Sequence, residues 1–186
     1  MGWIHETETH LHEASLVAVF EDGAESHGLT MVDGVDYEIV EHGRRSSEDR
    51  LRPRTEIVGW VLRCDCARWN SAEMSTWTDP IQWTRVPSAS LEDLTRHRVF
   101  APDTDIHADE RPEVEEAARV VWQREHLDPL DVDDEIRAAV AARRVADERL
   151  DTAVIRARRL GRSWAKIGVA AGMTAQSANE RWRNRA

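Results

Sequence analysis

The sequence predicts an α+β fold, in which a small mixed or antiparallel sheet comes first and helices follow. The N-terminal part holds short apolar runs rich in β-branched and aromatic residues, separated by polar turn segments. From residue 112 onward the apolar residues recur three and four positions apart, as on one face of a helix. The balance of acidic and basic residues also changes along the chain. From Thr152 to the last residue there are eight basic residues and one acidic residue, although the whole chain has a net charge of −10.

Four strands are expected in the N-terminal part. The strongest is Thr55–Cys66, which is nearly continuous in apolar and β-branched residues. The other three are Ala14–Phe20, Asp36–Gly43 and Ile81–Val86. Residues 1–10 are expected to form a loose leader, and residues 44–54 (RRSSEDRLRPR) are predicted to be a loop because they are too charged for a core.

Two helices are expected next. Pro112 and the acidic residues after it are typical of a helix start, and this helix should end near residues 127–131 (LDPLD). A long helix is predicted over Val132–Leu160, with Gly161 just past its end. Its stripe of small residues makes it a candidate dimerisation element, although a stripe rich in Ala and poor in Leu disfavours a strong coiled coil. Packing on the preceding helix is the alternative.

The C-terminal segment predicts two short helices with a tight turn between them. Ser163 and Thr174 stand where an N-cap hydroxyl is needed, and Gly172 stands where the first helix must reverse through a left-handed residue. So short a turn makes the helices cross steeply, as in a helix-turn-helix, and Gly168 and Ala178 supply the small residues for their contact. The chain is therefore divided into an acidic α+β domain (1–111), a helical connector (112–160) and a helix-turn-helix unit (161–186).

The spacing small-x3-Gly-x5-apolar, carried by Gly168, Gly172 and Ala178, resembles the helix-turn-helix of bacterial DNA-binding regulators. The stretch SWAKIGVAAGMTAQSANERW is also similar to the C-terminal helix-turn-helix of many uncharacterised proteins from high-GC bacteria. This resemblance implies a sequence-specific DNA-binding protein, acting as a transcriptional regulator through the major groove. The plainer alternative is a helical hairpin in which Gly172 serves only as a C-cap.

The outward face of the second short helix has the residue types that read base edges. Gln and Asn pair with adenine and Arg with guanine, each worth about 1–3 kcal/mol of discrimination. The predicted base contacts are Thr174, Ala175, Gln176, Ser177, Asn179 and Arg183. The predicted phosphate contacts are Arg156, Arg159, Arg162, Ser163, Lys166, Arg181 and Arg185. The expected partner is double-stranded DNA, and a homodimer would read a palindromic site.

A possible zinc site begins at Cys64-Asp-Cys66, which ends the strongest predicted strand. One Cys pair is half of a four-ligand site, and the usual two-residue spacing between the cysteines is absent. His10 and His12 would share one face of a strand, and His126 ends a predicted helix that can reach back. The predicted ligands are Cys64, Cys66 and His126. The alternative is that Cys64 packs as a small buried hydrophobe and Cys66 sits at a strand end without metal.

Other classes of protein are disfavoured by the sequence. No Gly-rich phosphate loop, nucleophile elbow or HExxH motif is present, so we expect no enzyme. No apolar run approaches the ~18 residues of a membrane span, and the N-terminus lacks the features of a signal peptide, so we expect a cytoplasmic protein with reduced thiols.

An adaptor is the rival function. Its acidic body would bind a basic partner or the transcription machinery, and its C-terminal helices would dock on protein. In a variant of the DNA-binding reading, the acidic segment 103–135 masks the basic tail until a partner arrives.

Overall fold

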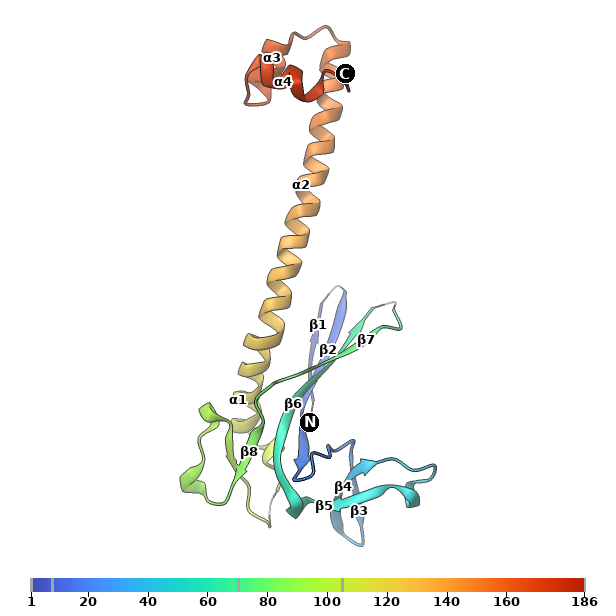
Figure 1. Cartoon of the computed structure of the whole chain (residues 1–186), viewed down its shortest axis with the longest axis vertical. Coiled ribbons are helices and arrows are strands. Elements are labelled where there is room, and N and C mark those ends of the chain that lie inside the picture. The colour runs from blue at the N-terminus through green and yellow to red at the C-terminus, as the bar shows by residue number, and fades with distance from the viewer. Residues whose placement is uncertain (1, 8, 70, 105, 186) are drawn as a thin grey trace. The chain divides into compact units, whose positions relative to one another are not determined.

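The structure is a computed structural model that describes residues 2–7, 9–69, 71–104 and 106–185. It confirms the α+β class, with strands first and helices after them (Figure 1). The chain forms two compact units, Met1–Pro129 and Leu130–Ala186. In the part of the chain that the structure describes, no helix combines the length and the apolar character needed to cross a membrane.

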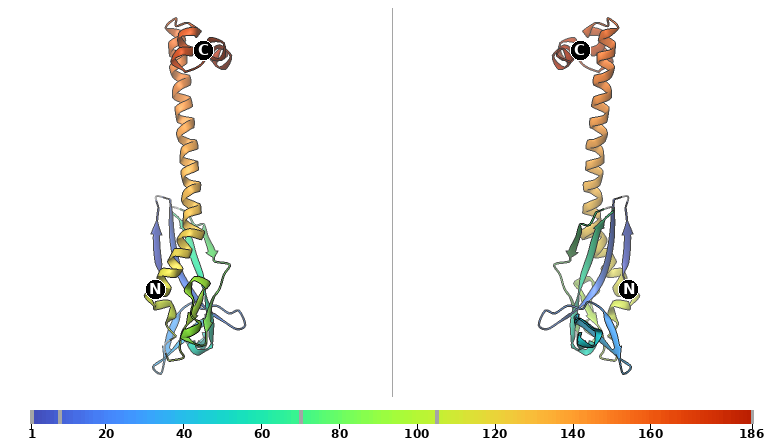
Figure 2. Two further views of the ribbon diagram at one scale, coloured as in Figure 1. Left: turned by 90° about the vertical axis from the view of Figure 1, so that its left-hand side faces the viewer. Right: turned by 90° about the vertical axis from the view of Figure 1, so that its right-hand side faces the viewer.

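The first unit is built around a curled six-stranded sheet (Figure 2). Its strand order is β1-β2-β6-β8-β9, and β7 also pairs with β6. Strands β8 and β9 run parallel and the other described pairs are antiparallel, so the sheet is mixed. The strands are β1 (Trp3–Glu6), β2 (His10–Phe20), β6 (Ile57–Arg68), β7 (Met74–Thr78), β8 (Trp83–Val86) and β9 (Arg98–Phe100).

A second sheet of three antiparallel strands lies in the same unit, in the order β3-β4-β5. Its strands are β3 (Leu29–Val32), β4 (Val35–Glu41) and β5 (Arg50–Pro53). Short 3-10 turns connect the strands: η1 (Ser46–Glu48), η2 (Arg54–Glu56), η3 (Ala89–Leu91) and η4 (Leu94–Arg96). A fifth, η5 (Ala108–Glu110), follows the last strand and precedes the first helix.

The four predicted strands correspond to β2, β4, β6 and β8, but two of the predicted irregular segments are wrong. Trp3–Glu6, placed in a loose leader, pairs with β2, and Arg50–Pro53, placed in a loop, pairs with β4. Each strand is four residues long, too short to show a period of two. Each is held by its neighbour's hydrogen bonds and, for β1, by burial of Trp3.

The main core of the first unit lies between the larger sheet and α1 (Pro112–Trp122). Alternate residues of β6 point into it, among them Trp60, Leu62 and Cys64, which are almost completely buried. From α1 the buried residues are Val114, Ala118, Val121 and Trp122. Helix α1 therefore belongs with the sheet.

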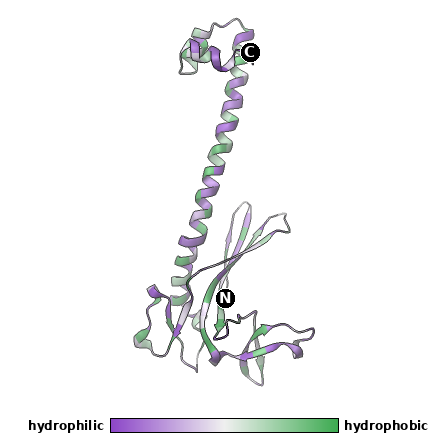
Figure 3. Cartoon of the chain, viewed as in Figure 1, coloured by the Kyte–Doolittle hydropathy of each residue, from purple (hydrophilic) through white to green (hydrophobic). Residues whose placement is uncertain are grey.

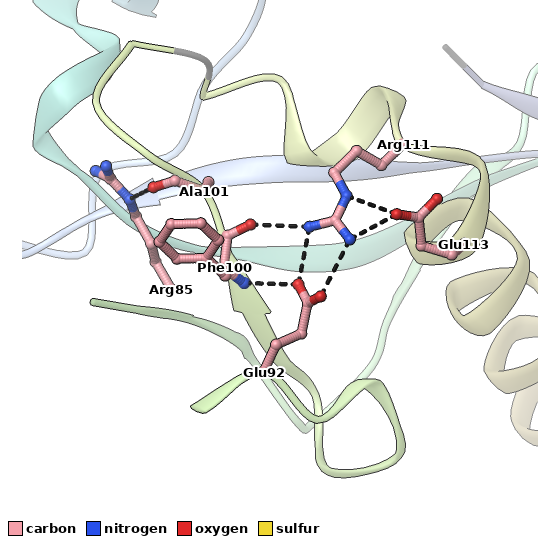
Figure 4. Close-up of polar contacts among 6 residues, drawn as sticks. All are labelled: Arg85, Glu92, Phe100, Ala101, Arg111 and Glu113. Atoms are coloured by element: carbon pink, nitrogen blue, oxygen red, sulfur yellow. Dashed lines mark hydrogen bonds and ion pairs between the residues drawn. The ribbon is translucent and has the colours of Figure 1, made fainter. Parts of the chain in front are cut away.

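A polar cluster fixes the start of α1 (Figure 4). The Arg111 guanidinium donates to both carboxylate oxygens of Glu92, at 2.8 and 3.1 Å, and to the Phe100 carbonyl at 2.9 Å. It also donates to Glu113 in the first turn of α1 at 2.6 Å. The ion pairs with Arg111 lower the pKa of Glu92 and of Glu113. The cluster ties the first turn of α1 to the segment around β9.

Helix α1 continues without a break through one π turn, η6 (Gln123–Leu127), into α2 (Asp128–Arg159). The predicted helix end near residues 127–131 is therefore wrong. The Asp128 amide reaches back to the Gln123 carbonyl, five residues earlier. Pro129 lacks a donor, and the wider turn beside it lets the helix accommodate the missing hydrogen bond.

The second unit comprises α2 from Leu130 onward, α3 (Trp164–Ala170) and α4 (Ala175–Trp182). Its core consists of Val154, Ile167, Ala178 and Trp182, with Leu150, Ala157, Trp164, Ala171 and Met173 packed around them.

The predicted caps of the two short helices are confirmed. The Ser163 hydroxyl accepts from the Lys166 amide at 3.4 Å, and the Thr174 hydroxyl accepts from the Ser177 amide at 3.1 Å. Gly172 has a φ of 69°, the left-handed conformation expected there. A Cβ at Gly168 would lie 2.8 Å from the Met173 carbonyl oxygen, which explains the need for glycine at the contact of the two helices.

Candidate metal centre and candidate nucleic-acid interface

Four metal-ligating side chains of the first unit meet in its interior. His12 comes from β2, Cys64 and Cys66 from β6, and His126 from η6. In the antiparallel register His12 stands opposite Cys66, and Cys64 lies two residues along the same strand, so the three share one face of the sheet. All four are at least nine-tenths buried, with exposed fractions of 4%, 0%, 9% and 8% in chain order.

Four of the six distances between the ligand atoms are close to those of a tetrahedral zinc site. Zinc bonds of about 2.3 Å to sulfur and about 2.0–2.1 Å to nitrogen place two sulfurs about 3.8 Å apart, a sulfur and a nitrogen about 3.6 Å apart and two nitrogens about 3.3 Å apart. The two Sγ atoms are 3.7 Å apart, and Nδ1 of His12 is 3.3 Å from Nε2 of His126. Cys64 Sγ lies 3.9 Å from His12 Nδ1, and Cys66 Sγ lies 3.3 Å from His126 Nε2. All four ligand atoms lie within 4.8 Å of one another, so small side-chain adjustments would place them around one metal ion such as Zn²⁺.

The π turn decides which residue after α1 reaches the cluster. Continuing the α-helical period from Ala118, Val121 and Trp122 would put Glu125 at the centre of the buried face and His126 at its margin. The extra residue of the π turn leaves Glu125 exposed and buries His126 and Leu127.

The surroundings of the cluster favour uncharged side chains in the absence of metal. Burial, and after it neighbouring Cys66, raises the pKa of the Cys64 thiol to about 12. Burial also lowers the pKa of His126 to about 4, with His12 adding to the effect. The Trp77 ring stacks on the His126 ring at a centroid distance of 4.8 Å and covers it. A divalent cation would displace the thiol protons and supply the positive charge that two buried thiolates need.

Of the predicted ligands, Cys64, Cys66 and His126 are brought together, and His12 completes the set. The sequence placed His12 beside His10 on one face of a strand without choosing between them or the other five histidines. The deciding fact is the register of β2 against β6, which sets His12 opposite Cys66 and His10 opposite Arg68, further along the sheet.

Helix α4 of the second unit presents most of the predicted base-contacting residues outward. Thr174, Ala175, Gln176, Ser177 and Arg183 are exposed, Asn179 is half-buried, and Ala178 and Trp182 lie in the core. The Gln176 amide donates to the Glu180 carboxylate at 2.9 Å. The Thr174 and Ser177 hydroxyls, 2.9 Å apart, are both part of the cap.

The predicted phosphate contacts fall into two groups. Arg181 pairs with Asp147 at 3.1 Å and Arg185 with Asp151 at 2.5 Å, so both are tied to α2. The other five are exposed: Arg156, Arg159, Arg162, Ser163 and Lys166. Within the described residues, the three arginines and the lysine of this group have no carboxylate partner. Asp151 also accepts the Trp182 indole N–H at 2.6 Å, so the acidic residues of α2 hold α4 in place.

No known protein family, characterised protein or solved structure matches this chain.

Proposed function

We propose that this chain is a sequence-specific DNA-binding protein and acts as a transcriptional regulator, with α4 as the helix that enters the major groove. The observation that carries the proposal is the division of α4 into two faces. Ala178 and Trp182 are fully buried, whereas Ala175, Gln176 and Ser177 are exposed. Small and amide side chains on an exposed helix face suit close approach to base edges.

The charges around α4 support the same proposal. Arg159 ends α2, and Arg162 and Lys166 flank the start of α3, all exposed. Such residues contact phosphates, which supply affinity and a strong salt dependence but no base preference. Glu180 is the exception. Its hydrogen bond from Gln176 holds that amide on the outer face and places a negative charge where phosphates would come.

The test is a selection of random duplex DNA by the purified chain, repeated with Gln176→Ala. We expect a defined motif with the unchanged chain and a relaxed base preference with the variant, by about 1–3 kcal/mol at one position. Gln82→Ala is the matched control, because Gln82 is an exposed glutamine of the first unit. An unchanged motif with Gln176→Ala would remove α4 as the reading helix.

Salt dependence separates phosphate contacts from base contacts. Arg162→Ala should weaken binding to every sequence and reduce the slope of log K against log salt by about 0.9. Glu180→Gln should strengthen binding to all duplexes, because it removes a charge that repels phosphate. If the chain binds no duplex at moderate salt and instead binds a basic protein partner, the adaptor is the better description.

We also propose that His12, Cys64, Cys66 and His126 bind one Zn²⁺ with a structural role. A tetrahedral set of two sulfurs and two nitrogens is the geometry typical of zinc. Four protein ligands leave no open position for water or substrate, which favours a structural over a catalytic ion. Bound there, zinc would link β2, β6 and η6, three segments far apart in the chain.

Metal analysis of the purified chain tests this proposal. We expect close to one zinc per chain after gel filtration, and cobalt substitution should give the absorption spectrum of a tetrahedral site with thiolate ligands. His12→Ala should lose the metal, whereas His10→Ala, two residues away on the same strand, should keep it. Equal metal content in the two variants would refute the ligand set.

A further inference from the structure

Helix α2 has an exposed apolar face that α3 and α4 leave uncovered. Its members are Val132, Ala139, Ala142, Ala146, Ala153 and Leu160, here called the alanine face. Five of them, all but Ala142, recur every seven residues over a length of about 42 Å. Val132 is 54% exposed and Leu160 is 72% exposed, although both are large apolar residues. Figure 3 shows that apolar residues recur along the whole of α2.

The two ends of this face differ in shape. At the C-terminal end an open groove of about 730 Å³ is lined by Ala153, Leu160, Arg149 and Arg156. At the N-terminal end Val132 is exposed. The helices α3 and α4 contact α2 through Val154 and Asp151, which do not line the groove, and through Ala157, which lies at its edge.

The charges along α2 are complementary from end to end. Residues 131–142 include four acidic residues and one basic residue, whereas residues 149–162 include five basic residues and one acidic residue. Glu135 lies within the alanine face, between Val132 and Ala139, and Arg156 lies within it, between Ala153 and Leu160. Asp131 and Arg159 flank the face at its two ends. All four are exposed, and within the part of the chain that the structure describes none of them forms an ion pair.

We propose that the alanine face binds the same face of a second copy of this chain, with the two α2 helices antiparallel. A two-fold axis beside Ala146 puts Val132 of each chain against Leu160 of the partner subunit, and Ala139 against Ala153 of the partner subunit. Small residues at these positions let the helix axes approach closely.

The antiparallel direction follows from the charges. In the same register Glu135 faces Arg156 of the partner subunit, and Asp131 faces Arg159 of the partner subunit. The two-fold axis repeats each pair, which gives four attractive pairs. A parallel pair would instead set the acidic ends side by side and the basic ends side by side, and like charges in contact are destabilising.

A charge swap in the full chain, followed by sedimentation equilibrium without DNA, tests the proposal. We expect a monomer–dimer equilibrium for the unchanged chain. Glu135→Arg alone and Arg156→Glu alone should each weaken association about tenfold, because each turns two attractive pairs into two repulsive ones. The double variant Glu135→Arg/Arg156→Glu should recover to within about threefold, because the attraction is restored with its signs exchanged.

Two variants that replace an alanine of α2 by glutamate test the packing of the two helices separately from the proposed ion pairs. Ala146→Glu places two carboxylates at the two-fold axis and should abolish the dimer, whereas Ala141→Glu, on the opposite side of α2, should not. Circular dichroism on each variant confirms that the helix is retained. A chain that stays monomeric at its highest soluble concentration, or a double variant as weak as the singles, would overturn the proposal. Because no DNA is present, failure here leaves the DNA-binding proposal untouched.

Discussion

The two units of this chain are stabilised by different means. The first, Met1–Pro129, has a large core with fully buried Trp60 and Trp83, and within the described residues their indole N–H groups have no hydrogen-bond partner. The second, Leu130–Ala186, buries four apolar residues, and its one buried tryptophan, Trp182, donates a hydrogen bond to Asp151.

The difference follows from how much surface each unit can bury. A sheet covered by a helix buries enough apolar area to leave some polar atoms unpaired. A unit of three helices with few buried residues depends on each contact, and its caps, its Gly168 contact and the Asp151 hydrogen bond all matter. The first unit should therefore tolerate loss of a surface contact, and the second should not.

The largest expected effect is that of Trp182→Ala. Removing a fully buried tryptophan costs about 3–5 kcal/mol, which should exceed the stability of so small a unit. Thermal melts of the full chain should show the second unit already unfolded and the transition of the first unit unchanged. Trp69→Ala is the control, since Trp69 is 44% exposed and should change little. If Trp182→Ala lowered the melting temperature of both units, the two units would not unfold independently.

Metal removal should also destabilise the chain, but in the first unit alone. Chelation should lower the stability of this unit by about 3 kcal/mol. Linkage predicts a loss of this size when the free concentration of the ion is about one hundred times its dissociation constant. The measurement is a pair of melts with and without chelator, with the zinc-free His12→Ala variant as the case in which chelator has no effect. A loss of stability confined to the second unit would contradict the proposed location of the metal ion.

Gly168→Ala should have a smaller effect, again on the second unit. The new Cβ would lie 2.8 Å from the Met173 carbonyl oxygen and 2.9 Å from that of Thr174, so the backbone must move. We expect a loss of about 1–3 kcal/mol by chemical denaturation. Gly2→Ala is a control in the first unit, where the nearest atom would be 3.3 Å away. An unchanged midpoint for Gly168→Ala would mean that α3 and α4 are not held as close as described.

The smallest expected effect is a dependence of the second unit on acid. Hydrogen bonding from Trp182, and then the charges of Arg185 and Arg181, lower the pKa of Asp151 below its ordinary 3.8. A carboxyl with a lower pKa in the folded state stabilises the fold above pH 3.8, and this contribution disappears as pH falls through the folded pKa. Asp151→Asn should lower stability at neutral pH and reduce its dependence on acid, as measured by melts from pH 6 down to about pH 3.

Local chemistry predicted some elements well. The caps Ser163 and Thr174 and the turn at Gly172 were predictable because each depends on a few neighbouring residues. Strands β2, β4, β6 and β8 were predictable for a similar reason, since apolar and β-branched residues recur along their segments of the chain. Strands β1, β3, β5, β7 and β9 are three to five residues long and depend on the strands beside them, so no signal of their own predicted them.

The candidate metal centre was predictable only in part. Cys64 and Cys66 are two residues apart, so a strand puts them on one face, and His126 stood at a predicted helix end. His12 was one of two candidates on its strand until the pairing of β2 with β6 set it opposite Cys66. The π turn at η6 had no signal in the sequence, because it depends on the helix fitting against the sheet.

The sequence by itself determined the class of fold, the two short C-terminal helices with their caps, and the two cysteines. All of these depend on spacings of a few residues, where backbone geometry allows few alternatives. Only the tertiary structure decided which histidines meet those cysteines and which side of α2 is left open. Both depend on distances between segments far apart in the chain, which are fixed by packing and strand register rather than by local preference.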